Sequence, residues 1–128
     1  MADYNYGFLM QFMNTVINST QTVNPTFYSG NVMFVNATTD ITITLESVSE
    51  HTMSKLKFIR TGSTVGTVTI NNVDNTNIIV RDADNGILEA TSLVSPSGVA
   101  GKMASLELMS DGTNWIGTDI CFGWTEGV

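Results

Sequence analysis

The chain has 128 residues, of which 42% are hydrophobic and 13% are charged, and its net charge is -7 at pH 7. This length suits a single domain with its own core, while five basic residues are too few to form a phosphate-binding surface, which argues against nucleic acid as a partner. The sequence shows neither a positively charged leader nor an apolar run of about 20 residues, so we expect synthesis in a cytoplasm and no membrane partner.

The first segment differs from the rest of the chain because its apolar residues recur at the spacing of one helical face. We predict a short amphipathic helix over residues 6–17, within an N-terminal arm of residues 1–25. This arm either folds back on its own domain or docks on another subunit, and we favour assembly contacts. The residues predicted to make them are Phe8, Leu9, Phe12, Met13, Val16, Ile17 and, in a C-terminal tail of residues 124–128, Trp124.

After Pro25 the hydrophobic period changes to that of strands. Short strands are predicted at residues 26–28, 32–35, 40–46, 55–60, 67–73 and 77–81, separated by turn residues. This pattern predicts an all-β fold, an antiparallel β-sandwich or barrel-like domain over residues 26–123. The alternating apolar residues expected in its core are Ile41, Ile43, Leu45, Phe58, Val68, Ile70, Leu106, Leu108 and Trp115.

The last third of the chain predicts a β-hairpin. Residues 104–108 alternate between apolar and polar side chains, and Asp111-Gly112 follows as the turn. An Asp-Gly pair favours a two-residue turn because both turn positions adopt positive φ. That register would set Leu108 opposite Trp115, whereas a three- or four-residue loop would shift the pairing.

Four pieces of the sequence carry a resemblance to a known family. They are residues 31–45 (NVMFVNATTDITITL), 56–60 (LKFIR), 67–70 (TVTI) and 106–115 (LELMSDGTNW). In this order the region 27–122 resembles a β domain of bacteriophage fibre and head-decoration proteins, although residues 46–49 depart from the proline-containing turn common there. Similar domains are usually homotrimers on the exterior of the virion.

The resemblance implies a virion structural protein, which would be synthesised in the host cytoplasm, but it does not give the position on the particle. Because only about 25 residues precede the β domain, too few for a fibre shaft, we expect a homotrimeric capsid decoration (cement) protein on the head exterior. Its expected partners are its own copies and the major capsid protein or other virion proteins. The alternative is a tail-fibre or spike component, such as a receptor-binding tip that recognises host glycans. A third class is a carbohydrate-binding or adhesin module outside any virus.

We expect no enzyme, no cofactor and no metal site. His51 is the sole histidine and lies in a polar segment, so we predict an exposed loop residue rather than a catalytic base. Asp82, Asp84 and Asn85 before Gly86 resemble the start of a calcium loop, but the later ligand positions do not match, which favours a turn. Cys121 lies between apolar neighbours and is expected to be a buried, inert thiol.

Overall fold

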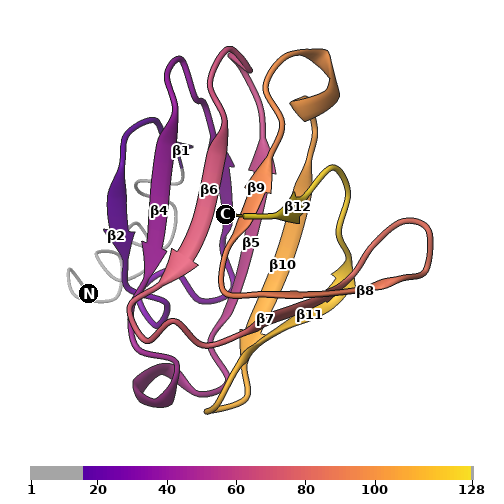
Figure 1. Cartoon of the computed structure of the whole chain (residues 1–128). Helices are drawn as coiled ribbons and strands as arrows, with labels where there is room; N and C mark the ends of the chain where they lie inside the picture. Colours follow the sequence, from indigo (N-terminus) through magenta and orange to yellow (C-terminus); the bar gives the residue numbers. More distant parts are fainter. Residues whose placement is uncertain (1–15, 128) are drawn as a thin grey trace, which may run out of the picture.

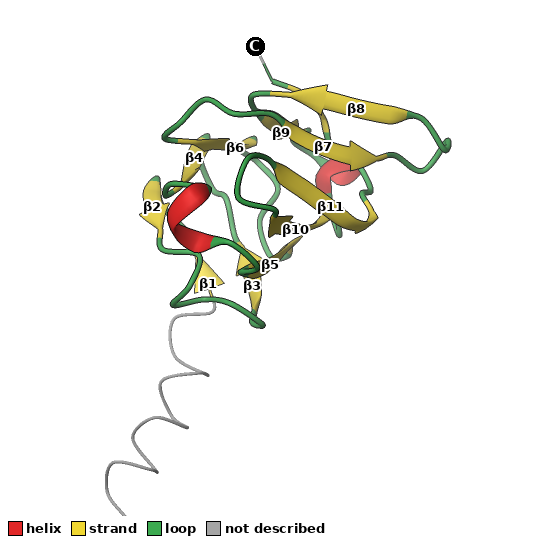
Figure 2. Ribbon diagram, turned by 90° about the horizontal axis from the view of Figure 1, so that it is seen from below, coloured by secondary structure: helices red, strands yellow, loops and turns green. Residues whose placement is uncertain are grey.

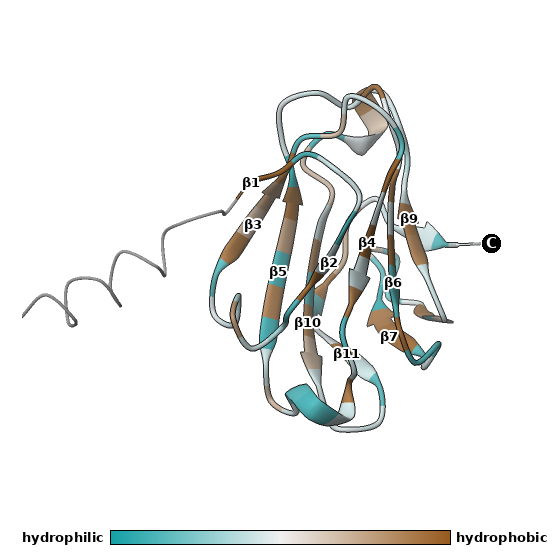
Figure 3. Cartoon of the chain, turned by 90° about the vertical axis from the view of Figure 1, so that its left-hand side faces the viewer, coloured by the Kyte–Doolittle hydropathy of each residue, from teal (hydrophilic) through white to brown (hydrophobic). Residues whose placement is uncertain are grey.

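The structure, a computed structural model, describes residues 16–127, and these form two β-sheets packed face to face (Figures 1 and 3). This confirms the predicted all-β sandwich. Within the described residues the helical segments are two short 3-10 turns (Figure 2). The elements are β1 (Val16–Ile17), β2 (Gln21–Val23), β3 (Val32–Val35), β4 (Ile41–Leu45), η1 (Ser49–His51), β5 (Lys55–Arg60), β6 (Val68–Asn72), β7 (Ile78–Arg81), β8 (Ile87–Ala90), β9 (Leu93–Ser95), η2 (Val99–Gly101), β10 (Ser105–Ser110), β11 (Trp115–Ile120) and β12 (Thr125–Glu126).

The strands of the first half alternate between the two sheets. The seven-stranded sheet has the order β1-β3-β5-β10-β11-β7-β8, and the five-stranded sheet has the order β12-β9-β6-β4-β2. Because each of the strands β1 to β6 is followed by one in the opposite sheet, neighbours within a sheet run in the same direction. Accordingly β1, β3 and β5 pair in parallel, as do β2, β4 and β6.

Both sheets are mixed, so the antiparallel pairing predicted for the sandwich is present in only part of it. Antiparallel pairing belongs mainly to the second half, where β7 and β8 form one hairpin and β10 and β11 form another. The central pair of the seven-stranded sheet, β5 with β10, is also antiparallel. Strand direction follows from which sheet each strand joins, and alternation of side chains alone does not specify that choice.

The core lies between the sheets and is formed by every second residue of the strands. The pattern is clearest in β4 and β10, whose buried residues alternate with partly exposed ones. All nine residues that the alternation assigns to the core are buried, each at most 4% exposed. Four further core residues that were not predicted are also fully buried: Met33, Leu56, Ile78 and Leu93.

Residues 16–23 and 124–126, at the two ends of the described chain, take part in the sandwich. β1 and β2 pair within the two sheets, and Ile17 and Val23 are buried in the core. Trp124 is also buried, and β12 directly after it pairs with β9. Ile17 and Trp124 are thus core residues and not the assembly contacts predicted for them. Val16 and Ile17, predicted as the end of a helix, form the strand β1.

Residues 26–28 form a turn where a strand was predicted. The side chain of Asn24 causes this, because its Oδ1 accepts hydrogen bonds from the backbone N–H of Thr26 at 3.0 Å and of Phe27 at 3.1 Å. An Asn side chain that binds the following amides in this way fixes a local turn and withdraws those donors from a strand ladder.

The β10–β11 hairpin has a four-residue loop and not the predicted two-residue turn. Ser110 pairs with Trp115, so Leu108 lies opposite Gly117. The carboxylate of Asp111 accepts hydrogen bonds from the N–H of Thr113 at 2.8 Å and of Asn114 at 2.7 Å, which favours the longer loop. The shift equals two residues, so Leu108 and Trp115 still share the buried face.

The segments 49–62 and 99–112 repeat one pattern of elements fifty residues apart. Each begins with a 3-10 turn, continues through a Met with positive φ (69° at Met53 and 65° at Met103) and enters a central strand. The two copies also bond reciprocally: the N–H of Met53 donates to Ser110 O at 2.8 Å, and that of Met103 to Arg60 O at 3.0 Å. The antiparallel β5–β10 pair therefore has a local pseudo-twofold arrangement.

Arg60, at the end of β5, ties the two sheets together. Its side chain is fully buried, and burial lowers the pKa of the guanidinium, which still stays protonated near neutrality. Nη1 donates to Ser95 Oγ at 3.1 Å and to Pro96 O at 2.6 Å, while Nη2 donates to Gly66 O at 2.6 Å and to Ser63 O at 3.5 Å. Because Ser95 ends β9, these bonds link the seven-stranded sheet to the five-stranded sheet.

Candidate interaction surface

The outer face of the seven-stranded sheet is formed by the residues that alternate with the core. In β3, β5 and β10 every second residue is buried between the sheets, so the residues between them point outward. Register then aligns the outward residues of neighbouring strands into rows that cross the sheet. Each row therefore combines side chains from several strands, and together these side chains determine whether the row is apolar, polar or charged.

One of these rows is apolar and exposed. Its members are in register: Val16 with Phe34, Phe34 with Ile59, Ile59 with Ser105, and Ser105 with Phe122. Val16, Phe34 and Phe122 are 58%, 39% and 51% exposed, and Ile59 is half-buried. We call Val16, Phe34, Ile59 and Phe122 the apolar row. Single exposed apolar residues are common on proteins, but several aligned in one row, here interrupted by Ser105, are typical of an interaction surface.

A charged cluster lies beside the apolar row, one step along β5 and β10. Lys55 Nζ lies 3.0 Å from Glu107 Oε1, and Lys57 Nζ lies 3.9 Å from Glu107 Oε2. Thr118 Oγ1 donates a hydrogen bond to Glu107 Oε1 at 2.8 Å. The two lysines and Glu107 line a hollow of about 200 Å³ together with residues 30–32.

The surroundings of Glu107 favour its charged form. Partial burial by itself raises the pKa of this carboxyl, but the hydrogen bond from Thr118 and the ammonium groups of Lys55 and Lys57 together outweigh it, so the pKa lies below its usual value. With two lysines around one carboxylate, the cluster keeps a positive charge in a chain whose net charge is -7. This part of the surface therefore repels acidic proteins less than the rest of the chain does.

The outer face of the five-stranded sheet differs, because its outward residues are uncharged and mostly threonine. Thr44 pairs with Thr22 on one side and with Asn71 on the other, while Thr42 pairs with Thr69. The threonine side chains present hydroxyl groups that water solvates well, whereas Oδ1 of Asn71 is buried without a hydrogen-bond partner. The outward residues are Thr22, Thr42, Thr44, Thr69, Asn71, Val94 and Thr125.

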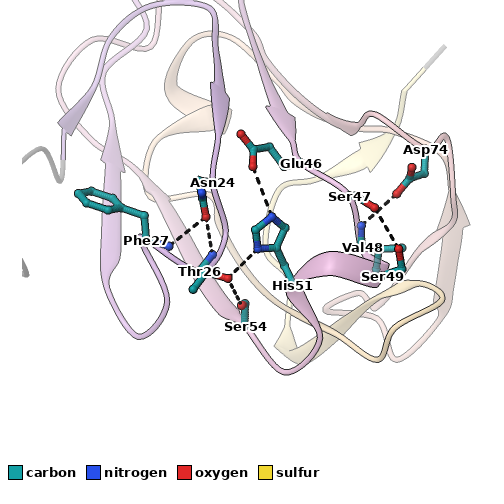
Figure 4. A network of polar contacts seen from close by, with 10 residues as sticks. All are labelled: Asn24, Thr26, Phe27, Glu46, Ser47, Val48, Ser49, His51, Ser54 and Asp74. Atoms are coloured by element: carbon teal, nitrogen blue, oxygen red, sulfur yellow. Dashed lines mark hydrogen bonds and ion pairs between the residues drawn. The ribbon is translucent and has the colours of Figure 1, made fainter.

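His51 joins a polar network between η1 and the turn at residues 25–30 (Figure 4). Its Nδ1 lies 2.6 Å from Thr26 Oγ1 and its Nε2 lies 3.3 Å from Glu46 Oε2, and Ser54 Oγ lies 3.3 Å from Thr26 Oγ1. The His51 side chain is only 10% exposed, so the predicted exposed loop residue is wrong. The short turn of η1 directs the ring against Thr26, which the sequence spacing does not reveal.

The order hydroxyl, imidazole and carboxylate in this network is also that of a hydrolytic triad, and the geometry decides what it does. A reacting carbonyl needs backbone N–H donors beside the nucleophile. The amides of Thr26 and Phe27 are instead taken by Asn24 Oδ1. The network thus fastens the turn at residues 25–30 to η1, and its bonds hold the loop that leads into β3.

The Asp82–Gly86 loop is held by hydrogen bonds within itself. Asp82 Oδ1 accepts from the N–H of Asp84 at 2.9 Å and of Gly86 at 2.8 Å, and Arg81 Nη1 donates to Asn85 Oδ1 at 2.8 Å. Asp82 therefore acts as a turn residue, as the sequence favoured. Within residues 16–127 no group of three His, Cys, Asp or Glu side chains is arranged to hold a metal ion.

Cys121 is buried, and its burial followed by the nearby charge of Asp82 raises the pKa of the thiol. A thiol with a raised pKa is a poor nucleophile. Across the described part of the chain, no helix is both long and apolar enough to cross a membrane.

The structure places the predicted contact residues in three different settings. Val16 is exposed and opens the apolar row, whereas Ile17 and Trp124 are buried. Phe8, Leu9, Phe12 and Met13 lie outside the described residues. Phe34 and Phe122 were not predicted as contacts; the signal that reveals them is the cross-strand register, which aligns residues from five separate segments.

Comparison of the chain with protein-family models, with characterised proteins and with solved structures finds no match.

Proposed function

We propose that the chain is a structural protein of a bacteriophage particle, a homotrimeric decoration (cement) protein on the exterior of the head. The resemblance of residues 27–122 to phage decoration and fibre domains supports the viral setting. The all-β sandwich agrees with the fold that this resemblance implies. Its partners are its own copies and the major capsid protein or other virion proteins.

The observation that carries the proposal is the exposed apolar row. Val16, Phe34 and Phe122 are 58%, 39% and 51% exposed, so covering what remains exposed of one such side chain stabilises an assembly by about 1 kcal/mol, roughly half the value for a whole side chain. An isolated chain gains nothing from these residues, whereas an assembly gains from all of them. The row therefore favours a protein that works as part of a larger structure.

Decoration acts by occupancy of many equivalent sites. A protein that binds the assembled shell and not its dissociated subunits stabilises the shell by mass action, and each site adds its own small contribution. The acidic, weakly charged surface keeps free copies soluble before they bind. No catalytic group is needed for this function.

The alternative is a tail-fibre or spike component, which the same resemblance includes. The number of copies per particle separates the two proposals, because a head lattice offers many equivalent sites and a tail offers few. Quantitative mass spectrometry of purified particles, calibrated on the major capsid protein, measures that number. Antibody labelling in electron micrographs gives the position.

The decoration proposal expects many copies per particle and labels over the head. A few copies with labels on the tail would replace it by the fibre proposal. Absence of the protein from purified particles, together with binding to a glycan array, would favour a carbohydrate-binding module and overturn both.

A further inference from the structure

We propose that the N-terminal segment of one copy, residues 6–15, binds the apolar row of a neighbouring copy and thereby closes the trimer. This inference rests on the homotrimer proposed above and names the contact that forms it. The segment lies outside the described residues, and the inference concerns its sequence and the point where it joins the sheet.

The composition of the segment matches the row. From Tyr4 to Ser19 the sequence carries no charged residue, and Phe8, Leu9, Phe12 and Met13 recur at the spacing of one helical face. The row is likewise uncharged, with two aromatic and two aliphatic side chains. Two uncharged apolar surfaces associate without the penalty of removing water from a charge.

The dimensions also match. The row crosses five chain segments, and at a spacing of about 4.8 Å between neighbours it is about 19 Å long. Ten residues of the predicted helix, at 1.5 Å each, are about 15 Å long. A helix of this length covers most of the row with one face.

The junction favours a neighbouring copy over the same chain. The segment joins the sheet at Val16, which is itself the first member of the row and lies on an edge strand. To cover its own row, the chain would have to turn at Thr15 and cross directly over Val16. The row of a neighbour is not joined to the segment through Val16 and lacks this constraint, and exchange of identical segments is a simple route to a closed symmetric oligomer.

The charged cluster supports the same arrangement. Neighbouring copies each carry a net charge of -7 and repel one another at long range. Lys55 and Lys57 lie near the row, and their two positive charges outnumber the single negative charge of Glu107. Contact at this face therefore brings two acidic chains together where their repulsion is reduced.

The test compares substitutions on the two sides of the proposed contact. Phe8→Ser with Phe12→Ser alters the segment, and Phe34→Ser with Phe122→Ser alters the row. Each pair is expected to raise the dissociation constant of the trimer by about 100-fold, measured by sedimentation equilibrium on the full chain. Because both pairs remove one interaction, all four substitutions together should weaken the trimer little more than either pair.

A matched control is available on the same molecule. Phe27 is 46% exposed, between the exposures of Phe34 and Phe122, and lies in the turn at residues 25–30 and not in the row. Phe27→Ser should leave the trimer unchanged. Circular dichroism of each variant separates lost association from lost folding, and the row variants are expected to stay folded because their side chains are exposed.

Disulfide trapping decides which copy supplies the segment. In the variant Met13→Cys with Ile59→Cys, and separately in Phe12→Cys with Phe34→Cys, oxidation should link different chains and give a ladder on a non-reducing gel. Cys121 is buried and does not compete. Disulfides confined within single chains, or no disulfide in either variant, would overturn the inference.

The outcomes also separate this inference from the proposed function. A stable trimer that is insensitive to Phe8→Ser with Phe12→Ser would overturn the segment exchange and leave the decoration protein intact. A wild-type chain that stays monomeric at micromolar concentration would overturn the exchange and the trimer together, and the copy number and antibody labelling described above would still decide the place in the virion.

Discussion

The two outer faces of the sandwich are both formed by mixed β-sheets, but their chemistry differs. On the five-stranded sheet the outward residues are mainly threonines, which water solvates and which carry no charge. On the seven-stranded sheet the outward residues include the apolar row and the cluster of Lys55, Lys57 and Glu107. Both faces arise from the same alternation of side chains, so the difference lies only in the residues at the outward positions.

This difference determines which face gains more free energy when it is covered. Burial of a threonine hydroxyl without a partner is unfavourable, whereas burial of a phenylalanine is favourable by about 1.5–3 kcal/mol. Strand-forming requirements do not explain the choice, because threonine and phenylalanine both favour strands. Covering the apolar row is therefore energetically more favourable than covering the threonine face, and this contrast is the basis of the proposed assembly.

The largest expected effect concerns the tie that holds the two faces in one domain. Arg60→Met should lower the free energy of unfolding by about 2–4 kcal/mol, because it leaves the carbonyls of Pro96 and Gly66 buried without their donors. Urea denaturation measures the change. Arg81→Met is the matched control, because the side chain of Arg81 bonds only to Asn85 in an exposed loop. It should change the free energy of unfolding by less than about 1 kcal/mol.

A smaller effect tests whether apolar outward residues are enough to create an interaction surface. Thr42→Phe with Thr69→Phe places two aromatic side chains in register beside Val94 on the threonine face. We expect self-association to strengthen by about 10-fold or more in sedimentation experiments. Thr42→Ser with Thr69→Ser should not change it. No new association in the phenylalanine variant would mean that hydrophobicity alone does not distinguish the faces.

The smallest effect concerns the charged cluster and depends on pH. The folded protein lowers the pKa of Glu107 below its usual value of 4.5, so this group stabilises the fold above that pH and its contribution is lost as the pH falls through the lowered pKa. Glu107→Gln should reduce stability by less than about 1 kcal/mol at pH 7, since both lysine partners are partly exposed and water screens their charges. Thermal melts of both proteins should converge as the medium becomes more acidic than pH 4.5.

Asp111 and Asp40 contribute in the same direction. Backbone hydrogen bonds from Asn114 and Thr113 lower the pKa of Asp111, and those from the N–H and hydroxyl of Thr67 lower that of Asp40. Some acid sensitivity should therefore persist in Glu107→Gln. An unchanged melting temperature of the wild-type chain down to pH 2 would contradict the assigned hydrogen bonds of all three carboxylates.

The sequence predicted the core well, since alternation in one strand needs no knowledge of its neighbours. Ile41, Ile43 and Leu45 alternate with threonines, and Leu106 and Leu108 with polar residues, and each apolar set faces inward. The all-β class of the fold follows from the same local alternation of apolar and polar residues. The hairpin loop was located correctly at Asp111 and Gly112, but its length depends on the bonds that Asp111 makes to Thr113 and Asn114.

Other features depend on contacts between distant segments and were missed for that reason. β8 and β9 are short and lack strong alternation, and they are strands because β7 and β6 pair with them. Trp124 follows a glycine near the end of the sequence and resembles a free tail residue, yet its ring is buried. The apolar row itself combines residues from five segments, so it exists only once the register is known.

The central claim is that the apolar row, and not the threonine face, is the surface through which the chain assembles. Sedimentation equilibrium of Phe34→Asp and Thr44→Asp compares the same added charge at one outward position on each face. We expect Phe34→Asp to be monomeric at concentrations where the wild-type chain and Thr44→Asp are trimeric. Dissociation of Thr44→Asp with an intact Phe34→Asp trimer would show that the assembly surface lies on the other sheet.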